Sequence, residues 1–524
     1  MVCSFLFLAG VQTVGLVGAD EPRYAQVARE ILQRRDYVTP TLWGKVWLEK
    51  PPLYYWMADI AYKAAGGVHD WAARLPSVAL AALMVFFIYF WARRFYKGMQ
   101  LDAALITAAS AAVVGFSRGA SMDMPLTATL SMAMLSWFAW YKERNRPWLL
   151  AFYVFLALAT LAKGPVAVFL VAVIIAIFLA LRRDWKLLQR SLWLPGVLLF
   201  LAVALPWYIA VQRANPDFFR VFILQQNLAR YASDLYRHAQ PFWFYVPVVL
   251  LGLVPWVVFV VAAVVDAIRD WRYSIEQPAG EEDLRTFLAI WFLLPILFFS
   301  LSRSKLPGYI LPAIPAGTIL LADFIRRRES EGDKPPLWMI LVHAVISAVL
   351  LIAVFIVPFK VLSLPIPKTA LVVSVLLAVC TLAFFIVALL SRGYRVLRFA
   401  TLVPVVIAFA MVLRGSAPIV DALLSARPVQ ASLQATALGQ LPVIAVYDVP
   451  RGIEYGLGFY RNHFVANYGW NGIPDATHIV VAKTGAKKAL EERLGQRRIT
   501  RIGGWGPQHL DFYLVAAKLA ETRR

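Results

Sequence analysis

Charged residues are scarce in this chain: 16% of its 524 residues are Asp, Glu, Lys or Arg, whereas 60% are hydrophobic. Soluble globular domains carry about 25% charged and roughly 45–50% apolar residues. The composition therefore excludes an ordinary soluble protein and indicates a polytopic membrane protein. The length suits about a dozen spans of roughly 20 residues each together with one soluble domain.

Cysteine is nearly absent too. Cys3 and Cys380 both lie in apolar runs far apart in the sequence, so neither a disulfide framework nor a cysteine metal site is expected. The formal net charge of +21 does not indicate nucleic acid binding, because most Lys and Arg residues stand in short clusters at the ends of apolar runs. Such clusters orient a membrane chain and contact anionic lipids.

Long hydrophobic runs, by contrast, are abundant, and they predict about thirteen transmembrane helices. The predicted spans are 2–17, 72–92, 101–117, 124–141, 148–162, 164–181, 192–212, 242–265, 286–301, 306–325, 337–357, 369–391 and 396–413.

The short loops alternate in basic content, with arginine and lysine clusters near residues 93, 144, 183, 327 and 395 all on one side. By the positive-inside rule that side is cytoplasmic. The opposite face then holds the loop 18–70, the loop 213–240 and everything after about residue 414. On this face no HxxH, HExxH, DxD or glycine-rich phosphate loop occurs, which argues against a nucleotide-sugar or ATP site built on those motifs.

The loop 18–70 is polar and rich in aromatics, unlike the rest of the chain. Apolar residues recur at helical spacing from Tyr24 to Ile31, and a second, proline-started segment runs from Pro51 to Ala61. Both patterns predict helices that lie in the membrane interface.

The tail after Arg414 has no run of spanning length. Strands are predicted at Val443 to Val449, His478 to Ala482 and Asp511 to Ala517, and an amphipathic helix at Gly485 to Gly495. The predicted organisation is a transmembrane domain over residues 1–414 and a small extracytoplasmic α/β domain over residues 415–524.

Acidic residues at two helix starts are open to two interpretations. Asp20 either caps the helix that follows, where Glu21 and Pro22 would complete the first turn, or accepts a proton from an acceptor nucleophile. Asp123, at the mouth of a span, is likewise either a helix cap or a functional carboxylate.

Cations near this face suggest phosphate binding. Lys50, in the segment Glu49-Lys50-Pro51-Pro52, could stabilise a phosphate leaving group, while Glu49 orients a group or binds a metal ion. Both could equally be polar loop residues. Lys163 ends a span, where it could simply extend toward the interface.

The connection from Ser302 to Tyr309 offers two cations, two hydroxyls and a phenol. Arg303, Lys305 and Tyr309 could form a phosphate cradle, although a charged turn between two helices would look the same. His238, in the loop before Pro241, is either an ordinary loop histidine or a metal ligand.

With these motifs in this order, the chain resembles the polytopic, lipid-carrier-dependent glycosyltransferases of the GT-C type. The lipid A aminoarabinose transferases and the bacterial protein O-mannosyltransferase-like branch are the members that it resembles. The resemblance covers residues 1 to about 415 and rests on six ordered motifs: Asp20-Glu21-Pro22-Arg23-Tyr24-Ala25, Glu49-Lys50-Pro51-Pro52-Leu53, Met122-Asp123-Met124, Leu161-Ala162-Lys163-Gly164-Pro165, Phe242 to Pro255, and Ser304-Lys305-Leu306-Pro307-Gly308-Tyr309-Ile310-Leu311-Pro312. Gly308 departs from the family pattern, in which a hydroxyl or similar small residue is frequent.

The resemblance implies a GT-C fold, a polyprenyl-phosphate-linked monosaccharide as donor, and inversion at the anomeric carbon. It implies no obligatory cofactor, although a Glu/His pair can hold a zinc ion. It assigns the two acids to Asp20 and Asp123, the phosphate-contacting groups to Lys50, Lys163 and Tyr309, and the metal ligands to Glu49 and His238. Beside these, the further residues predicted to bind substrate are Glu21, Arg23, Tyr24, Arg303 and Lys305.

The sequence thus predicts a bacterial inner-membrane enzyme with a periplasmic site that glycosylates an acceptor of the lipid A or lipopolysaccharide type. One alternative is a protein O-mannosyltransferase. A transporter or flippase of lipid-linked sugars is an alternative from another class, but it should carry ionisable residues along a path between both faces, whereas here they gather on one.

Overall fold

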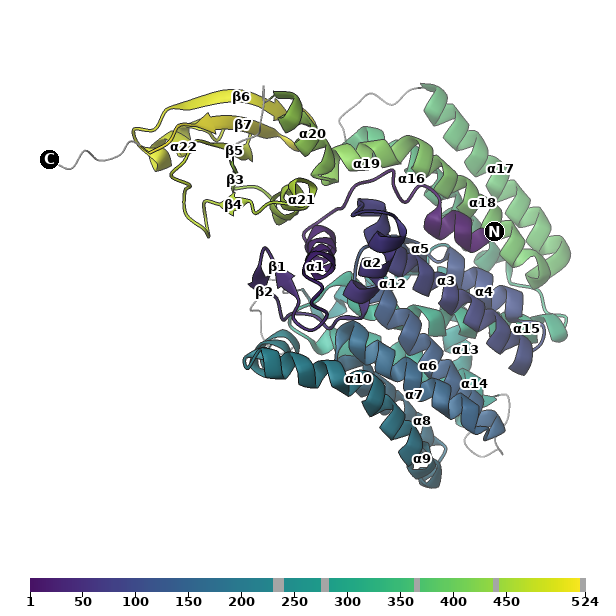
Figure 1. The fold of residues 1–524 in the computed structure, drawn as a ribbon. Helices are drawn as coiled ribbons and strands as arrows, with labels where there is room; N and C mark the ends of the chain where they lie inside the picture. The colour runs from purple at the N-terminus through teal and green to yellow at the C-terminus, as the bar shows by residue number, and fades with distance from the viewer. Residues whose placement is uncertain (230–239, 275–281, 362–367, 437–442, 519–524) are drawn as a thin grey trace.

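The computed structural model describes residues 1–229, 240–274, 282–361, 368–436 and 443–518. It shows a bundle of helices with a small sheet at one end, above the amino-terminal helix α1 (Figure 1). The arrangement expected from the sequence, a helical bundle followed by a small α/β unit, is therefore present.

Seven helices among the described residues are long and apolar enough to cross a membrane, or up to nine spans if each of two bent pairs counts as one. The chain is a multi-pass membrane protein, and the figure of about thirteen spans stays a prediction. The seven are α3 (Asp70–Phe95), α7 (Arg146–Lys163), α10 (Leu194–Ala214), α14 (Glu282–Leu301), the segment Pro307–Ser330 made of η4 (Pro307–Ala313) and α15 (Ile314–Ser330), the segment Leu371–Arg392 of α17 (Lys368–Arg392), and the segment Leu397–Leu424, which contains α18 (Leu397–Met411), η6 (Val412–Ser416) and α19 (Ala417–Leu424).

The bent pairs are α4 (Gln100–Ala109) with α5 (Ala111–Ser117), bent by 63°, and Phe242–Gly252, formed by η3 (Phe242–Phe244) and α12 (Tyr245–Gly252), with α13 (Val257–Ser274), bent by 117°. Further helices of the bundle are α6 (Asp123–Glu143), α8 (Val166–Leu181), α9 (Trp185–Ser191), η2 (Phe219–Ala229), α16 (Leu337–Val361) and η5 (Gly393–Val396). Helix α6 is buried without interruption from Met124 to Tyr141, so it forms the centre of the bundle.

The predicted span 2–17 is wrong as a long helix. Only a short π-helix, η1 (Ser4–Leu8), forms there, and turns follow it. Backbone carbonyls beyond the helix instead accept hydrogen bonds from buried or half-buried arginines: Arg74 binds the carbonyls of Val11, Val14 and Gly15. An apolar run whose carbonyls have such partners need not close its hydrogen bonds within a helix.

Both helices predicted in the loop 18–70 are present, as α1 (Asp20–Arg34) and α2 (Leu53–Ala64), separated by the hairpin β1 (Thr41–Leu42) and β2 (Lys45–Val46). The predicted apolar face of α1, with Tyr24, Val27 and Ile31, is buried as expected. Arg35 takes a left-handed conformation at φ 55° and ends α1. The position of α1 and α2 in a membrane interface stays a prediction.

The carboxyl-terminal sheet has the strand order β4-β3-β5-β7-β6, with β3 parallel to β4 and β5, and β7 antiparallel to β5 and β6. Its elements are α20 (Arg427–Thr436), β3 (Val443–Tyr447), α21 (Arg451–Arg461), β4 (Ala466–Asn467), β5 (His478–Lys483), α22 (Lys487–Leu494), β6 (Ile499–Trp505) and β7 (Leu510–Val515). The three predicted strands and the predicted helix are confirmed within a few residues. The boundary at residues 414 and 415 stays a prediction.

Helix α21 packs on α1, and this contact places the carboxyl-terminal unit over the loop 18–70 (Figure 1). The Arg29 guanidinium donates to the carbonyl of Phe459 at 2.7 Å and lies over its ring, with 4.2 Å to the ring centroid. Nearby, Arg427 pairs with both Asp70 and Asp421. These buried and half-buried ties hold the two parts of the chain together.

Candidate active site

Glu21 ties together three segments at the start of α1. Its carboxylate is 7% exposed and accepts hydrogen bonds from Arg74 Nε and Nη2 at 3.1 and 2.7 Å, and from the backbone N–H groups of Val17 and Ala120 at 2.8 and 2.7 Å. Since four protein donors already surround it, the geometry favours a structural role for Glu21. The substrate-binding role stays a prediction.

Replacing Glu21 by glutamine should destabilise the protein by roughly 3 kcal/mol, because the buried Arg74 would lose its counter-ion. The midpoint of thermal unfolding in detergent should fall by several degrees. Asp448→Asn is the matched control, because it breaks an ion pair with Lys483 in which both side chains are more than half exposed and such pairs contribute at most about 1 kcal/mol. Equal midpoints for the two variants would contradict the structural role.

Asp20 is the first residue of α1, and the preceding Ala19 occupies the cap position without a side-chain hydrogen bond. The Asp20 carboxylate instead forms an ion pair with Arg23, one turn along, and remains 51% exposed. The helix-cap interpretation is therefore not what the structure shows. A half-exposed carboxylate at a helix start is accessible to an acceptor.

Arg23 lies among aromatic rings from three parts of the chain. Its guanidinium carbon is 5.7 Å from the Tyr24 ring centroid and 5.3 Å from those of Trp47 and Tyr455, the last in α21. Burial alone would lower the pKa of the Arg23 guanidinium. Nearby groups, Tyr24 and Asp20 among them, more than offset this effect, so the pKa lies well above its usual value. Arg23 is therefore a fixed cation.

Buried donor atoms gather around Arg23. Arg23 Nε, Trp47 Nε1 and the Tyr55 hydroxyl are buried without a hydrogen bond of ordinary geometry. Glu49 acts electrostatically on both Arg23 and Tyr55, so it belongs to the same group. Unpaired buried donors are costly in a finished fold, which makes this group a candidate for contact with a polar ligand.

Asp123, Lys163 and Tyr309 meet although they come from α6, α7 and η4. Lys163 forms an ion pair with Asp123, and its Nζ lies 4.8 Å from the Tyr309 ring centroid. Met122 precedes α6 without a side-chain cap, so Asp123 faces a cation rather than capping the helix.

Gly308 leaves the space that the Asp123 carboxylate occupies. A Cβ at this position would lie 2.6–2.8 Å from the carboxyl atoms of Asp123. Such contacts are shorter than van der Waals separation, so any other residue would displace the carboxylate. The departure from the family pattern at this position thus has a local cause in this chain.

A cavity of about 430 Å³ opens beside this ion pair. One part of its wall is polar, with Lys50, Lys163, Ser302, Ser304, Tyr309, Gln226 and Asn227, and another is apolar, with Leu126, Pro165, Val166, Phe169, Phe298 and Phe299. The Ser304 hydroxyl is buried without a hydrogen-bond partner among the described residues. The cavity therefore combines cations and a free hydroxyl with an apolar surface.

Two members of the predicted phosphate cradle lie elsewhere. Lys305 is buried and donates to the backbone carbonyls of Ser302 and Gln240, and burial lowers its pKa. Arg303 is exposed, and neither side chain is among those that line the described cavity. Lys305 thus braces the connection between α14 and η4, and the phosphate roles of both residues stay predictions.

Of the two predicted metal ligands, only Glu49 lies among the residues that the structure describes. Glu49 lies beside Arg23, whereas His238 falls outside the described residues. Within the described ranges no three or more His, Cys, Asp and Glu side chains gather in a way that would hold a metal ion. A zinc ion at Glu49 and His238 stays a prediction.

The sequence predicted the cations and acids of the site but not most of the residues that surround them. Phe169, Phe298 and Phe299 are ordinary span residues in the sequence, and Tyr455 comes from the distant tail. Gln226 and Asn227 could have been singled out, because they lie in a polar loop assigned to the same face.

Known proteins resemble this chain in sequence. The model of the family described as dolichyl-phosphate-mannose-protein mannosyltransferase matches residues 49–209. The undecaprenyl phosphate-alpha-4-amino-4-deoxy-L-arabinose arabinosyl transferase of Pseudomonas paraeruginosa is 32% identical over 335 residues, which are 63% of this chain and 59% of that protein. The enzyme of the same name from Edwardsiella ictaluri is 30% identical over 324 residues, covering 60% and 56% of the two chains.

The matched part is therefore less than two thirds of the length of these relatives. In three dimensions the likeness extends further. The crystal structure of ArnT from Cupriavidus metallidurans bound to undecaprenyl phosphate superposes with a TM-score of 0.78, covers 98% of this chain and 96% of that one, and has 23% sequence identity. This likeness shows that the two chains share a fold, and together these matches confirm the resemblance drawn from the sequence.

Proposed function

We propose that this chain is an inverting glycosyltransferase of the GT-C type. It moves a monosaccharide from a polyprenyl-phosphate carrier to an acceptor of the lipid A or lipopolysaccharide type. The named relatives are undecaprenyl phosphate-alpha-4-amino-4-deoxy-L-arabinose arabinosyl transferases, and the chain shares the fold of ArnT. The transferred sugar is a pentose or a hexose.

The observation that carries the proposal is the cavity beside Lys163. Lys50, Lys163 and Tyr309 line its polar part, and Phe169, Phe298 and Phe299 line its apolar part. A polyprenyl phosphate has the matching chemistry, because its phosphate is anionic and its chain belongs in an apolar groove continuous with lipid. A water-soluble nucleotide sugar would not need the phenylalanine wall.

The proposed reaction needs a good leaving group and a positioned acceptor. The acceptor oxygen attacks the anomeric carbon, the bond from that carbon to the phosphate oxygen breaks, and the phosphate leaves with the electron pair. Lys50, Lys163 and Tyr309 stabilise the developing negative charge. A hydroxyl acceptor must also lose a proton, which Asp20 or Asp123 accepts, whereas a phosphate acceptor is already nucleophilic.

The ion pair of Asp123 with Lys163 supports the role of Lys163 in stabilising the phosphate charge. Lys163 is held by a carboxylate at the cavity wall, so its cation stands beside the position proposed for the phosphate before the donor arrives. Preorganised charge of this kind contributes more than charge that must be reoriented during the reaction.

We place the site on the periplasmic face of the bacterial inner membrane. Helix α3 begins near the site at Asp70 and ends at Arg93 and Arg94, while α7 begins at Arg146 and ends near the site at Lys163. The arginine-rich ends are cytoplasmic by the positive-inside rule. The carboxyl-terminal unit, which we assign to residues 415–524, then lies on the periplasmic side as a second domain.

A protein O-mannosyltransferase is the second candidate, because the matching family model carries that description. Both activities would use the same donor site, so only the acceptor distinguishes them. A flippase is less well supported, because Lys50, Lys163 and Tyr309 gather at one cavity.

The test is a reconstituted reaction. Purified protein with polyprenyl-phosphate-linked sugar should release polyprenyl phosphate when a lipid A-type acceptor is added. Release with a Ser- or Thr-containing peptide but not with lipid A would favour the O-mannosyltransferase. No release with either acceptor, over a panel of pentose and hexose donors, would overturn the proposal.

Replacing Gly308 by alanine should reduce turnover by about 10-fold or more without unfolding the protein, because the new methyl group displaces the Asp123 carboxylate from Lys163 and small misplacements of reacting groups cost as much as about 100-fold. The measurement is the rate of polyprenyl phosphate release. Gly115→Ala is the matched control, since a Cβ there meets nothing within 4 Å. Unchanged turnover in Gly308→Ala would contradict a role for the position of Asp123.

A further inference from the structure

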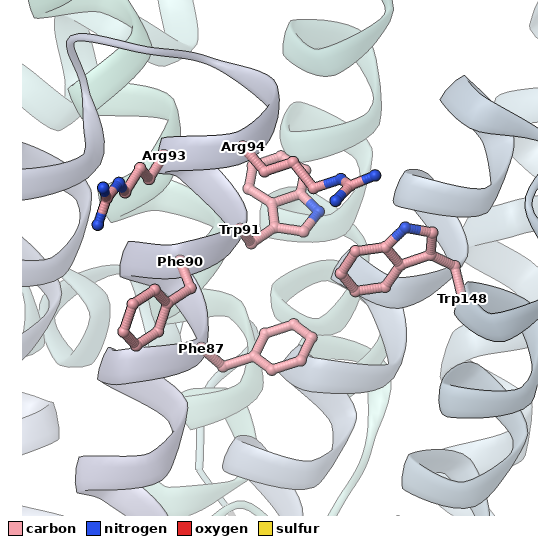
Figure 2. Close-up of a pocket in the computed structure, with 6 residues that line it drawn as sticks. All are labelled: Phe87, Phe90, Trp91, Arg93, Arg94 and Trp148. Atoms are coloured by element: carbon pink, nitrogen blue, oxygen red, sulfur yellow. The ribbon is translucent and has the colours of Figure 1, made fainter.

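A second cavity, of about 420 Å³, lies far from the site just described. Figure 2 shows its lining: Phe87, Phe90, Trp91, Arg93 and Arg94 from the last turns of α3, and Trp148 from the first turns of α7. The two guanidinium groups lie at one end of this groove, beyond the phenyl rings.

One wall of the groove is fixed by polar contacts. Arg94 donates two hydrogen bonds to Glu143 at 3.0 and 3.1 Å, and the Trp148 indole donates to the same carboxylate at 3.0 Å. The Arg94 guanidinium also lies 5.9 Å from the Trp148 ring centroid. This wall is thus preformed by α3, α7 and the end of α6.

Arg93 has no such partner. Its side chain is exposed, and no carboxylate among the described residues pairs with it. Segments 93–97 and 142–146 hold three cations each and share a single acid, Glu143. Of the two cations that line the groove, Arg94 is engaged by Glu143, so Arg93 leaves the rim with a net positive charge.

Apolar side chains lead from this rim along the surface of α3. Leu83, Phe86 and Phe90 follow one another at helical spacing and are 49%, 53% and 59% exposed. The 26 residues of α3 span about 39 Å at 1.5 Å per residue, close to the bilayer thickness of about 40–45 Å including head groups. Since α3 starts beside the candidate active site, the groove lies at head-group level on the opposite surface.

We propose that this groove is a binding site for one phospholipid with an anionic head group. The lipid phosphate contacts Arg93 at the rim, and an acyl chain follows Leu83, Phe86 and Phe90 toward the bilayer centre. Charge complementarity selects the occupant, because a basic groove between transmembrane helices attracts anionic rather than zwitterionic head groups. The site is separate from the donor cavity, which contains Lys50 and Lys163 at the other ends of the helices.

The test is native mass spectrometry of the full-length protein in detergent, titrated with phosphatidylglycerol or with phosphatidylcholine of the same chains. The wild-type protein should retain one phosphatidylglycerol more tightly than phosphatidylcholine. Arg93→Gln should weaken phosphatidylglycerol retention by about fivefold, since one cation near a membrane surface contributes about that factor. Phe90→Ala should also weaken it by at least about fivefold, because the acyl chain loses apolar contact with the ring. Both side chains are exposed, so neither change should impair folding.

Lys186→Gln is the control, because it removes an exposed cation from α9, at the same end of the bundle, without touching the groove. It should leave retention unchanged. Equal retention of the two lipids by the wild type, or wild-type retention by both Arg93→Gln and Phe90→Ala, would overturn the proposal. Displacement of the lipid by millimolar inorganic phosphate would also overturn it, because the groove would then bind a free anion.

Discussion

Replacing Asp20 by asparagine should lower the rate of polyprenyl phosphate release by about 100- to 10,000-fold with a hydroxyl acceptor, the range that general-base catalysis contributes. The carboxylate stands half-exposed at the start of α1 and is held by Arg23. Asparagine keeps its size but cannot accept the proton. With a phosphate acceptor, which needs no deprotonation, the loss should be much smaller.

Asp217→Asn is a closely matched control. Asp217 also pairs with an arginine three residues on, Arg220, and is 71% exposed, but it belongs to no part of the proposed site. It should retain wild-type turnover. If Asp20→Asn turned over as fast as Asp217→Asn with a hydroxyl acceptor, Asp20 would have no part in the mechanism.

Variants of Asp123 and Lys163 should distinguish loss of turnover from loss of donor binding. Lys163→Gln should weaken binding of polyprenyl phosphate by about 10- to 100-fold, because a hydrogen bond to a charged group contributes about 1.5–3 kcal/mol. Asp123→Asn should bind polyprenyl phosphate at least as tightly as the wild type, since it removes a negative charge beside the phosphate. Its turnover with a hydroxyl acceptor should nevertheless fall by about 100-fold, because Asp123 is one of the two carboxylates that can accept the proton.

The measurement is the dissociation constant of polyprenyl phosphate together with the turnover number for each variant. Lys45→Gln, an exposed lysine on β2 that does not line the cavity, should leave both unchanged. Wild-type affinity in Lys163→Gln would remove this lysine from the phosphate site. Weakened binding in Asp123→Asn would show that the carboxylate acts by shaping the site rather than in catalysis.

The sequence alone predicted the helices of the first loop because their signals are local. Periodicity placed Tyr24, Val27 and Ile31 on one buried face, and the structure agrees. The same local logic failed for residues 2–17, since an apolar run carries no sign that Arg74 will bind its carbonyls from another helix.

Contacts between distant segments were out of reach for the same reason. The partners of Glu21 include Arg74, 53 residues on, and the backbone of Ala120, 99 residues on, so nothing near Glu21 indicates its burial. Gly308 looked like an unimportant departure from a family pattern, and only the approach of Asp123 explains it. Tyr455 reaches Arg23 through the packing of α21 on α1.

The position of the carrier phosphate is the central claim, and a cryo-electron microscopy map of the wild-type protein with polyprenyl phosphate tests it most directly. The account predicts the phosphate within hydrogen-bond distance of Lys50, Lys163 and Tyr309, with the chain along Phe169 and Phe299. Polyprenyl phosphate bound with its phosphate outside this cavity would contradict it.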